Sequence, residues 1–172
     1  MRAEIIAVGT ELLLGQIVNT NAQYLSRQLA SMGIDVYYQT VVGDNMDRLQ
    51  EALRLSSSRA DIVLLSGGLG PTQDDLTKDA LASFLGRSIH IDRIAMDRIE
   101  RFFMDRGVVM TENNRRQALA VEGGTPLPNE TGLAVGNAIT HEDTHYIVLP
   151  GPPKELIPMF EQEAKHGCYS MY

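Results

Sequence analysis

The chain has 172 residues, of which 44% are hydrophobic and 22% charged, and its formal net charge at pH 7 is -7. This length favours a single domain with one sizeable core, and the ordinary composition argues against disorder or a fibrous repeat. An acidic chain matches the phosphate backbone of nucleic acids poorly, so we expect no nucleic-acid partner. A small anionic ligand is still compatible, because backbone N–H groups, a helix N-terminus or a bound cation can hold it.

Cysteine usage and hydropathy bear on localisation. Cys168 is the only cysteine, so no internal disulfide or cysteine-based metal cluster is expected. The apolar run 5–8 is short and is flanked by Glu4 and Glu11, unlike a secretory signal. No apolar stretch approaches the ~20 residues of a membrane span. We therefore expect a cytoplasmic protein without a membrane partner.

The first half of the chain predicts three successive strand–helix units. The expected strands cover residues 2–9, 34–42 and 61–65, and a helix is expected after each of them. Capping residues at 19–21 and at 43–45 begin the first two helices, and the third helix begins at residue 76. The strands are nearly continuous apolar runs, which is typical of a parallel sheet covered by helices on both faces. The sequence thus predicts a three-layer α/β/α fold with a mostly parallel sheet.

The second half adds three further elements. The spacing of apolar residues predicts an amphipathic helix over 92–106. Residues 136–141 and 144–149 are expected to form a small β-hairpin, and Pro153 to open a final helix that runs through Glu163. We place one domain at 1–164 and a short tail at 165–172.

The loop after the third strand carries the clearest binding signal. In open α/β sheets ligands bind beyond the carboxyl ends of the strands, and 66–75 follows such an end. Gly67, Gly68 and Gly70 allow positive φ and a close approach of backbone N–H groups to a phosphate. A tight turn without a ligand fits this pattern equally well, and the spacing matches neither a Walker loop nor a dinucleotide fingerprint.

Four carboxylates stand at or beside the expected strand ends: Glu11, Asp44, Asp74 and Asp75. Carboxylates together with phosphate oxygens are ligands that Mg²⁺ or Mn²⁺ selects, and a cation would offset the repulsion between an acidic protein and an anionic ligand. The alternative is that Asp44, Asp74 or Asp75 caps a helix. Asn113, Arg115 and Lys154 are candidate contacts to phosphate, with an ordinary exposed surface as the alternative.

Several blocks of the sequence, in order, resemble one known family. They are Gly9-Thr10-Glu11-Leu12-Leu13 with Asn19-Thr20-Asn21, then Ser66 to Thr72 with Asp74-Asp75-Leu76-Thr77, then Asn113 to Ala118, Asn129 to Gly136, and Leu149-Pro150-Gly151. This ordered set is similar to the CinA family, the competence/damage-inducible proteins, over about residues 1–163.

The resemblance implies the fold of the molybdopterin-binding proteins of molybdenum cofactor synthesis, the MogA/MoaB type. It also implies a metal-dependent pyrophosphatase that acts on ADP-ribose-like dinucleotides with Mg²⁺, Mn²⁺ or Co²⁺, and a homo-oligomer. Asp44 and Asp75 match aspartates in the active site of the related molybdopterin proteins. The expected ligand contacts are Gly9, Thr10, Ser66, Gly67, Gly68, Leu69, Gly70, Thr72, Asn113, Arg115, Pro150, Gly151 and Lys154.

The leading functional prediction is therefore an enzyme that hydrolyses the phosphoanhydride of ADP-ribose or a similar dinucleotide to AMP and a sugar phosphate. One alternative is a protein that binds or adenylylates molybdopterin. Another is a non-catalytic module that senses a nucleotide or a pterin. Shared fold does not separate these functions, because chemistry belongs to the site and not to the fold.

Overall fold

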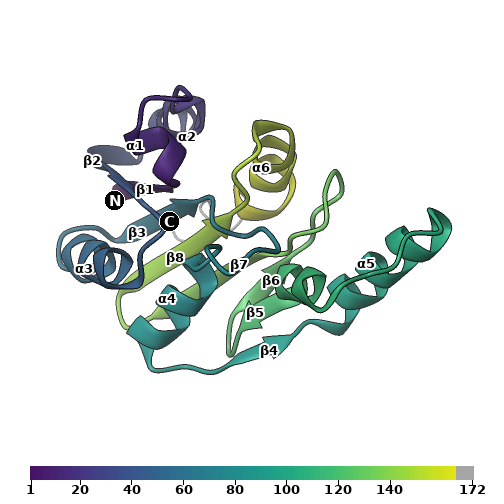
Figure 1. The fold of residues 1–172 in the computed structure, drawn as a ribbon. Helices are drawn as coiled ribbons and strands as arrows, with labels where there is room; N and C mark the ends of the chain where they lie inside the picture. Colours follow the sequence, from purple (N-terminus) through teal and green to yellow (C-terminus); the bar gives the residue numbers. More distant parts are fainter. Residues whose placement is uncertain (166–172) are drawn as a thin grey trace.

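The computed structural model describes residues 1–165, and its core is a six-stranded sheet in the order β2-β1-β3-β8-β7-β6 (Figure 1). The strands are β1 (Arg2–Val8), β2 (Asp35–Val42), β3 (Ile62–Ser66), β6 (Thr125–Leu127), β7 (Gly136–His141) and β8 (Thr144–Leu149). β2, β1, β3 and β8 are parallel, whereas β7 runs antiparallel to both of its neighbours. The predicted mostly parallel sheet is confirmed.

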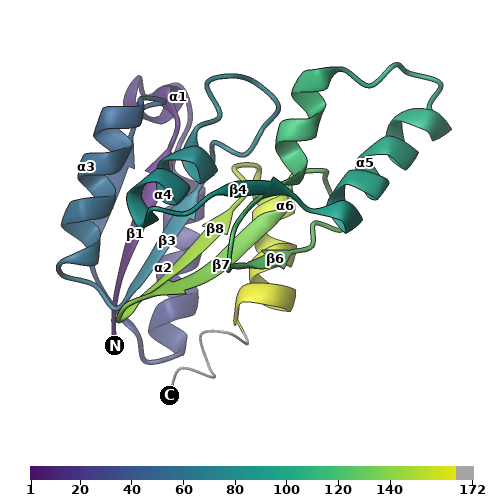
Figure 2. The same ribbon diagram turned by 90° about the horizontal axis from the view of Figure 1, so that it is seen from below.

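Helices cover both faces of this sheet (Figure 2). They are α2 (Thr20–Ser31), α3 (Met46–Ser57), α4 (Thr77–Leu85) and α6 (Pro153–Met159). The helices α3 and α4 pack on the face that carries Val63 and Leu65, and α2 and α6 on the face that carries Ile62 and Leu64. Because strand side chains alternate between faces, the continuous apolar runs serve two separate halves of the core. The three-layer arrangement is thus confirmed.

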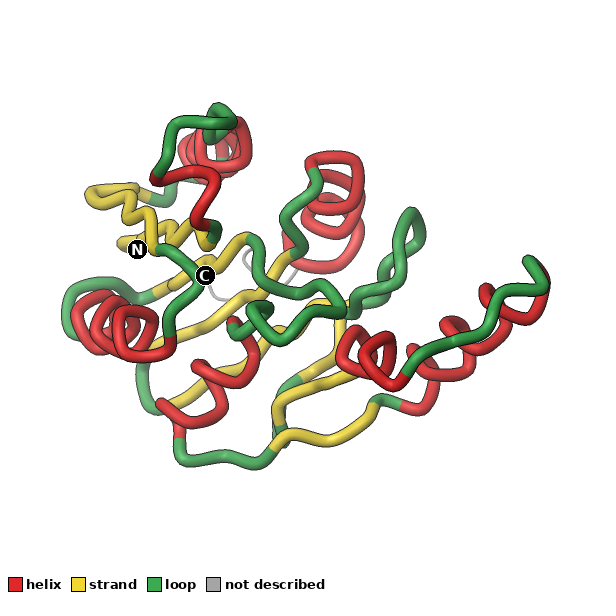
Figure 3. Tube along the Cα trace, viewed as in Figure 1, coloured by secondary structure: helices red, strands yellow, loops and turns green. Residues whose placement is uncertain are grey.

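A smaller lobe projects from one end of the main sheet, as the trace in Figure 3 also shows. It consists of β4 (Ile89–Ile91), α5 (Arg93–Asp105), the 3₁₀ helix η1 (Glu112–Ala118) and β5 (Leu119–Val121). β4 pairs antiparallel with β5, and α5 packs on η1 through a core of its own around Ile99 and Ala118. The helix over 92–106 is confirmed, but the two short strands beside it were not predicted.

The last predicted elements are present with one change of geometry. Residues 136–149 form the expected hairpin, which joins the main sheet through β8. The final helix keeps α-helical geometry to Met159 and continues as a π-helical turn, η2 (Phe160–Ala164). Pro158 lies inside α6 and has no N–H to give to the Lys154 carbonyl, and the Thr131 hydroxyl donates to that oxygen instead, at 2.8 Å.

The structure also bears on the expected lack of a membrane span and on the expected tail. No helix within residues 1–165 is long and apolar enough to cross a membrane. Of the tail expected at 165–172, only Lys165 belongs to the described residues, where it donates to Glu161 and Gln28. Residues 166–172 lie outside them.

Candidate functional site

The strand order creates a crevice at the carboxyl ends of β1 and β3. The chain leaves β1 toward α2 on one face of the sheet and leaves β3 toward α4 on the other. Loops that diverge from neighbouring parallel strands open a gap between them, and ligands of open α/β sheets bind at such switch points. The loops that follow β1, β2, β3 and β8 all end at this edge, in agreement with the sequence analysis.

The glycine-rich turn after β3 has the backbone conformation that its glycines predict. Gly67 and Gly68 have φ values of +101° and +69°, which residues other than glycine rarely adopt. The Thr77 hydroxyl donates to the Gly67 carbonyl at 2.7 Å, so the start of α4 holds the turn in place. Among the described residues, no acceptor is recorded for the N–H groups of Gly68, Leu69 or Gly70. These three donors remain available to an anion.

Asp75 is held by the turn that carries it. Its Oδ2 accepts from the Thr72 backbone N–H at 2.9 Å and from the Thr72 hydroxyl at 2.7 Å, and Oδ1 keeps its acceptor capacity. The carboxylate also lies 2.7 Å from the position that a Cβ on Gly70 would occupy. Asp74 is exposed. Neither aspartate caps α4, whose N-cap is Leu76, so the capping alternative is wrong for both.

Asp44 follows the same pattern at the end of β2. Its Oδ2 accepts from the backbone N–H and the hydroxyl of Thr10, at 3.2 and 3.1 Å. Thr10 opens the short helix α1 (Thr10–Leu13), which was not predicted. Asn45, not Asp44, caps α3. The capping alternative therefore fails here too, and a carboxylate–threonine pair connects the loops after β1 and β2.

The four carboxylates do not form a ready-made metal cluster. Within residues 1–165 no three His, Cys, Asp or Glu side chains lie close enough together to hold a metal ion. The expectation that several carboxylates converge is therefore not met by Glu11, Asp44, Asp74 and Asp75 as a set. Yet Mg²⁺ is commonly bound by one or two carboxylates plus substrate phosphate and water, and Asp44 and Asp75 each keep one oxygen for such a role.

Asn21 joins three loops and was missed as a site residue by sequence reasoning. Its Nδ2 donates to the Ser66 hydroxyl at 3.0 Å and to the Gly151 carbonyl at 2.6 Å. Sequence reasoning assigned Asn19 to Asn21 jointly to helix capping, but only Asn19 caps α2, by accepting from the Ala22 N–H. The signal was available, because one capping residue per helix leaves the second asparagine for another contact.

Other predicted contacts have mixed outcomes. Pro150 is buried, and a Cβ on Gly151 would lie 3.5 Å from the Cα of Gly67, which brings this loop against the glycine turn. Arg115 pairs with Glu112 at 3.3 Å on an exposed surface, and the Asn113 and Lys154 side chains are also exposed. None of the three is seen to hydrogen-bond to the turn within the described chain.

Arg116, the neighbour of Arg115, reaches the glycine turn instead. Its Nη2 donates to the Asp75 carbonyl at 2.9 Å and to the Asp79 carboxylate at 2.7 Å. Lys78 is buried close by in the first turn of α4, and burial lowers the pKa of its amine to about 7. The smaller lobe is thus tied to α4 by an ion pair and to the loop that carries Asp75 by a hydrogen bond.

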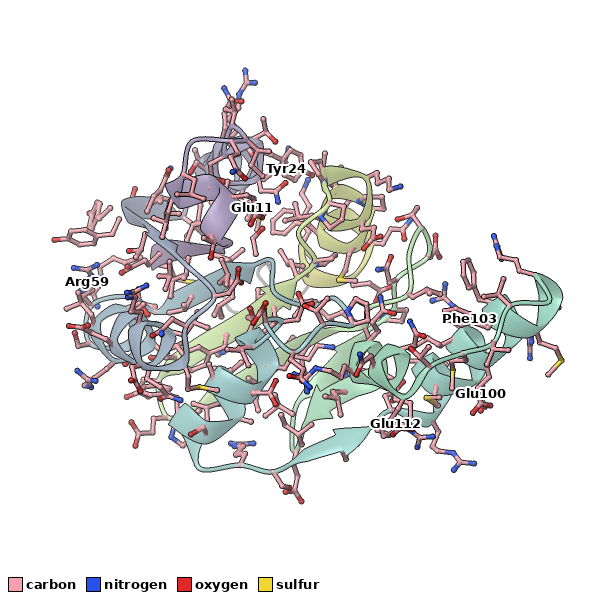
Figure 4. The ribbon with its side chains drawn as sticks, in the orientation of Figure 1. Glu11, Tyr24, Arg59, Glu100, Phe103 and Glu112 are labelled. Atoms are coloured by element: carbon pink, nitrogen blue, oxygen red, sulfur yellow. The ribbon has the colours of Figure 1, made fainter. Side chains whose placement is uncertain are left out.

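Glu11 completes the site from the other side. Its carboxylate lies 2.5 Å from where a Cβ on Gly9 would stand, so the side chain folds back toward the end of β1 (Figure 4). A Cβ at position 9 would meet only the end of this side chain, so it would displace the Glu11 carboxylate and not the backbone. The Gly9 N–H is occupied by the Val42 carbonyl at 2.9 Å, so Gly9 itself offers no donor to a ligand.

Comparison with known proteins identifies the family. Residues 4–166 match the family described as "Probable molybdopterin binding domain". The crystal structure of CinA from Thermoplasma acidophilum, a protein of unknown function, superimposes with a TM-score of 0.88 at 32% identity, covering 96% of this chain and 98% of that one. The chain belongs to the CinA family. The MogA/MoaB-type fold is confirmed by MoaB from Thermus thermophilus, with a TM-score of 0.63 at 21% identity over 96% of this chain and 92% of that one.

Curated CinA relatives are longer than this chain. A "Putative competence-damage inducible protein" of Streptococcus gordonii is 58% identical over 164 residues, which are 95% of this chain and 39% of that protein. One from Lysinibacillus sphaericus is 56% identical over 171 residues, 99% of this chain and 41% of its own length. The chain therefore spans about two fifths of these relatives, and the activity of a whole CinA protein is a separate question.

Proposed function

We propose that this CinA domain binds a nucleoside diphosphate derivative of the ADP-ribose type and hydrolyses its phosphoanhydride bond, giving AMP and a sugar phosphate. The observation that carries the proposal is the turn at 68–70, with backbone donors that are left free, at the same sheet edge as two carboxylates that threonines orient. Donors for phosphate oxygens and carboxylates for a cation or a proton are the groups that phosphoanhydride hydrolysis needs.

Each group has a distinct role in this reaction. The N–H groups of 68–70 donate to phosphate oxygens and stabilise the charge that develops there. Asp44 and Asp75 would hold a divalent cation such as Mg²⁺, Mn²⁺ or Co²⁺, which when bound polarises a phosphoryl oxygen. Water adds to one phosphorus, the bridging P–O bond breaks, and the proton of the water passes to a carboxylate or to solvent. Arg116 holds the Asp75 backbone while this happens.

A molybdopterin ligand is the second candidate, and the family description favours it. Molybdopterin also joins a phosphate to a flat heterocycle, so the same turn and crevice suit it, and an adenylyl transfer to it would again need donors for phosphate. A module that binds either ligand without turnover is the third candidate. Binding and product formation must therefore be measured separately.

The test is release of AMP from ADP-ribose by the purified chain with Mg²⁺, Mn²⁺ or Co²⁺ and with a chelator. We expect metal-dependent AMP release that falls about 100-fold or more in Asp75→Asn, because the amide keeps the shape but loses the negative charge. Asp97→Asn, on the exposed side of α5, is the matched control and should keep full activity. Full activity in Asp75→Asn would refute the assignment. Tight pterin binding without AMP release from ADP-ribose would favour the second candidate.

A further inference from the structure

A cavity of about 270 Å³ adjoins the glycine turn on the side of α1 and α2. Its walls include Leu12, Ile17, Val18, Asn21, Ser66 and Pro153. Ser66 is the last residue of β3 and directly precedes the proposed phosphate donors, so a ligand held by the turn can extend into this cavity without leaving the crevice.

The outer wall of the cavity is apolar and yet open to solvent. Val18 is 81% and Ile17 53% exposed, although both lie in a loop anchored at its end by the capped start of α2. A single exposed apolar residue needs no explanation, but adjacent ones that line a cavity beside polar groups are typical of a ligand site. A flat ring with apolar faces would cover them, whereas the sugar phosphate arm of a dinucleotide would not.

The polar wall of the cavity has a defined orientation. The Asn21 amide nitrogen must face the Gly151 carbonyl, because the reverse orientation would bring two oxygens to 2.6 Å. Within residues 1–165, no donor to the Asn21 Oδ1 is recorded. A residue that lines the cavity therefore offers an acceptor for an N–H group on the edge of a ring.

Glu11 also lines this cavity, with its carboxylate folded toward the end of β1. A carboxylate next to an apolar ring site is suited to accept from the vicinal hydroxyls of a ribose. This use of Glu11 differs from the metal-ligand role predicted from sequence. It also separates a nucleoside from a pterin, which has no ribose.

We propose that this cavity is the nucleoside subsite: Ile17 and Val18 cover the base, Asn21 accepts from its edge, and Glu11 accepts from the ribose. The inference rests on the proposed function, since it supposes that phosphate lies on the 68–70 turn. It adds that the nucleoside arm, and not the sugar phosphate arm, contacts the loop before α2.

The experiment compares binding of AMP and of ribose 5-phosphate, which lacks the base, by calorimetry in the presence of Mg²⁺. We expect AMP to bind about tenfold or more tightly, and Val18→Ser to weaken AMP by about five- to tenfold while ribose 5-phosphate is unchanged, since the variant removes apolar contact only. Val109→Ser is the matched control, because Val109 is 85% exposed in the smaller lobe and does not line the cavity.

Three results would overturn the subsite. They are unchanged AMP affinity in Val18→Ser, equal weakening of both ligands, and a reduced pterin that binds more tightly than AMP and depends on Val18. Failure here is distinct from failure of the proposed function. If the wild type releases AMP from ADP-ribose but Val18→Ser does not change the affinity for AMP, the hydrolase proposal stands and the subsite fails. If the expected binding pattern is found without AMP release, the subsite stands and the hydrolase proposal fails.

Discussion

Replacing Lys78 with methionine is expected to raise the free energy of unfolding at pH 7 by about 4 kcal/mol. Lys78 is 3% exposed, and its Nζ has no hydrogen-bond partner among the described residues. Burial is the main cause that lowers its pKa from 10.5 to about 7; Arg116 lowers it further, while Asp79 and Asp92 raise it. Methionine fills a similar volume and has no charge to lose on folding.

The pH dependence of this effect has a definite sign. In the unfolded chain the lysine keeps its ordinary pKa, so between pH 7 and 10.5 the unfolded state binds more protons and stability rises with pH. The destabilisation that results from burying the Lys78 amine reaches its full size below pH 7. It amounts to about 1.4 kcal/mol for each unit between the unfolded pKa of 10.5 and the folded pKa of about 7, or about 5 kcal/mol.

Urea unfolding at pH 7, 8 and 9 measures this effect. The wild type should gain about 2 kcal/mol relative to Lys78→Met from pH 7 to 9. Lys154→Met, at an exposed position, should follow the wild type at every pH. The expectation would be contradicted if the free energies of unfolding of the wild type and Lys78→Met changed equally with pH, or if Lys78→Met were the less stable protein. Either result would show that the amine is hydrogen-bonded or ion-paired in solution.

Gly67→Ala is expected to destabilise the chain by about 3–5 kcal/mol. Its φ of +101° is strained for alanine, and a Cβ there would lie 2.3 Å from the Val8 carbonyl oxygen, which is backbone within β1 and not free to move aside. The same turn donates from the Gly67 N–H to the Leu149 carbonyl, so displacement would disturb β8 as well.

The matched control for Gly67 is Gly107→Ala. Gly107 also has a positive φ, of +62°, but nothing lies within 4 Å of its Cβ position. It should lose only about 1 kcal/mol, the cost of the left-handed conformation itself. Chemical denaturation of the two variants separates conformational strain from collision. Equal losses would contradict the close packing of the turn on β1.

The sequence predicted five of the six strands of the main sheet, all but β6, and the location of the crevice, because these follow from long local patterns. Apolar runs such as 61–65 are readable as buried strands, and parallel strands bring their following loops to one edge. Of the three glycines expected to allow positive φ, Gly67 and Gly68 adopt it and Gly70 does not.

The failures concern contacts between distant segments. β4 and β5 are three residues each and pair across 27 intervening residues, too short for a period-2 pattern to show. The choice between Arg115 and Arg116 depends on which side of the 3₁₀ helix η1 faces α4, and neighbouring arginines look alike in sequence. The buried position of Lys78 was equally invisible, because lysine in the first turn of a helix is normally exposed.

The proposed function requires the glycine turn at the carboxyl ends of β1 and β3 to bind the phosphate of the ligand. Amide chemical shifts, followed by nuclear magnetic resonance while AMP and Mg²⁺ are added to the labelled chain, test it most directly. We expect the largest shifts at the free N–H groups of Gly68, Leu69 and Gly70. Shifts concentrated instead around the separate cavity between α5 and β6, lined by Ala95 and Leu133, would contradict it.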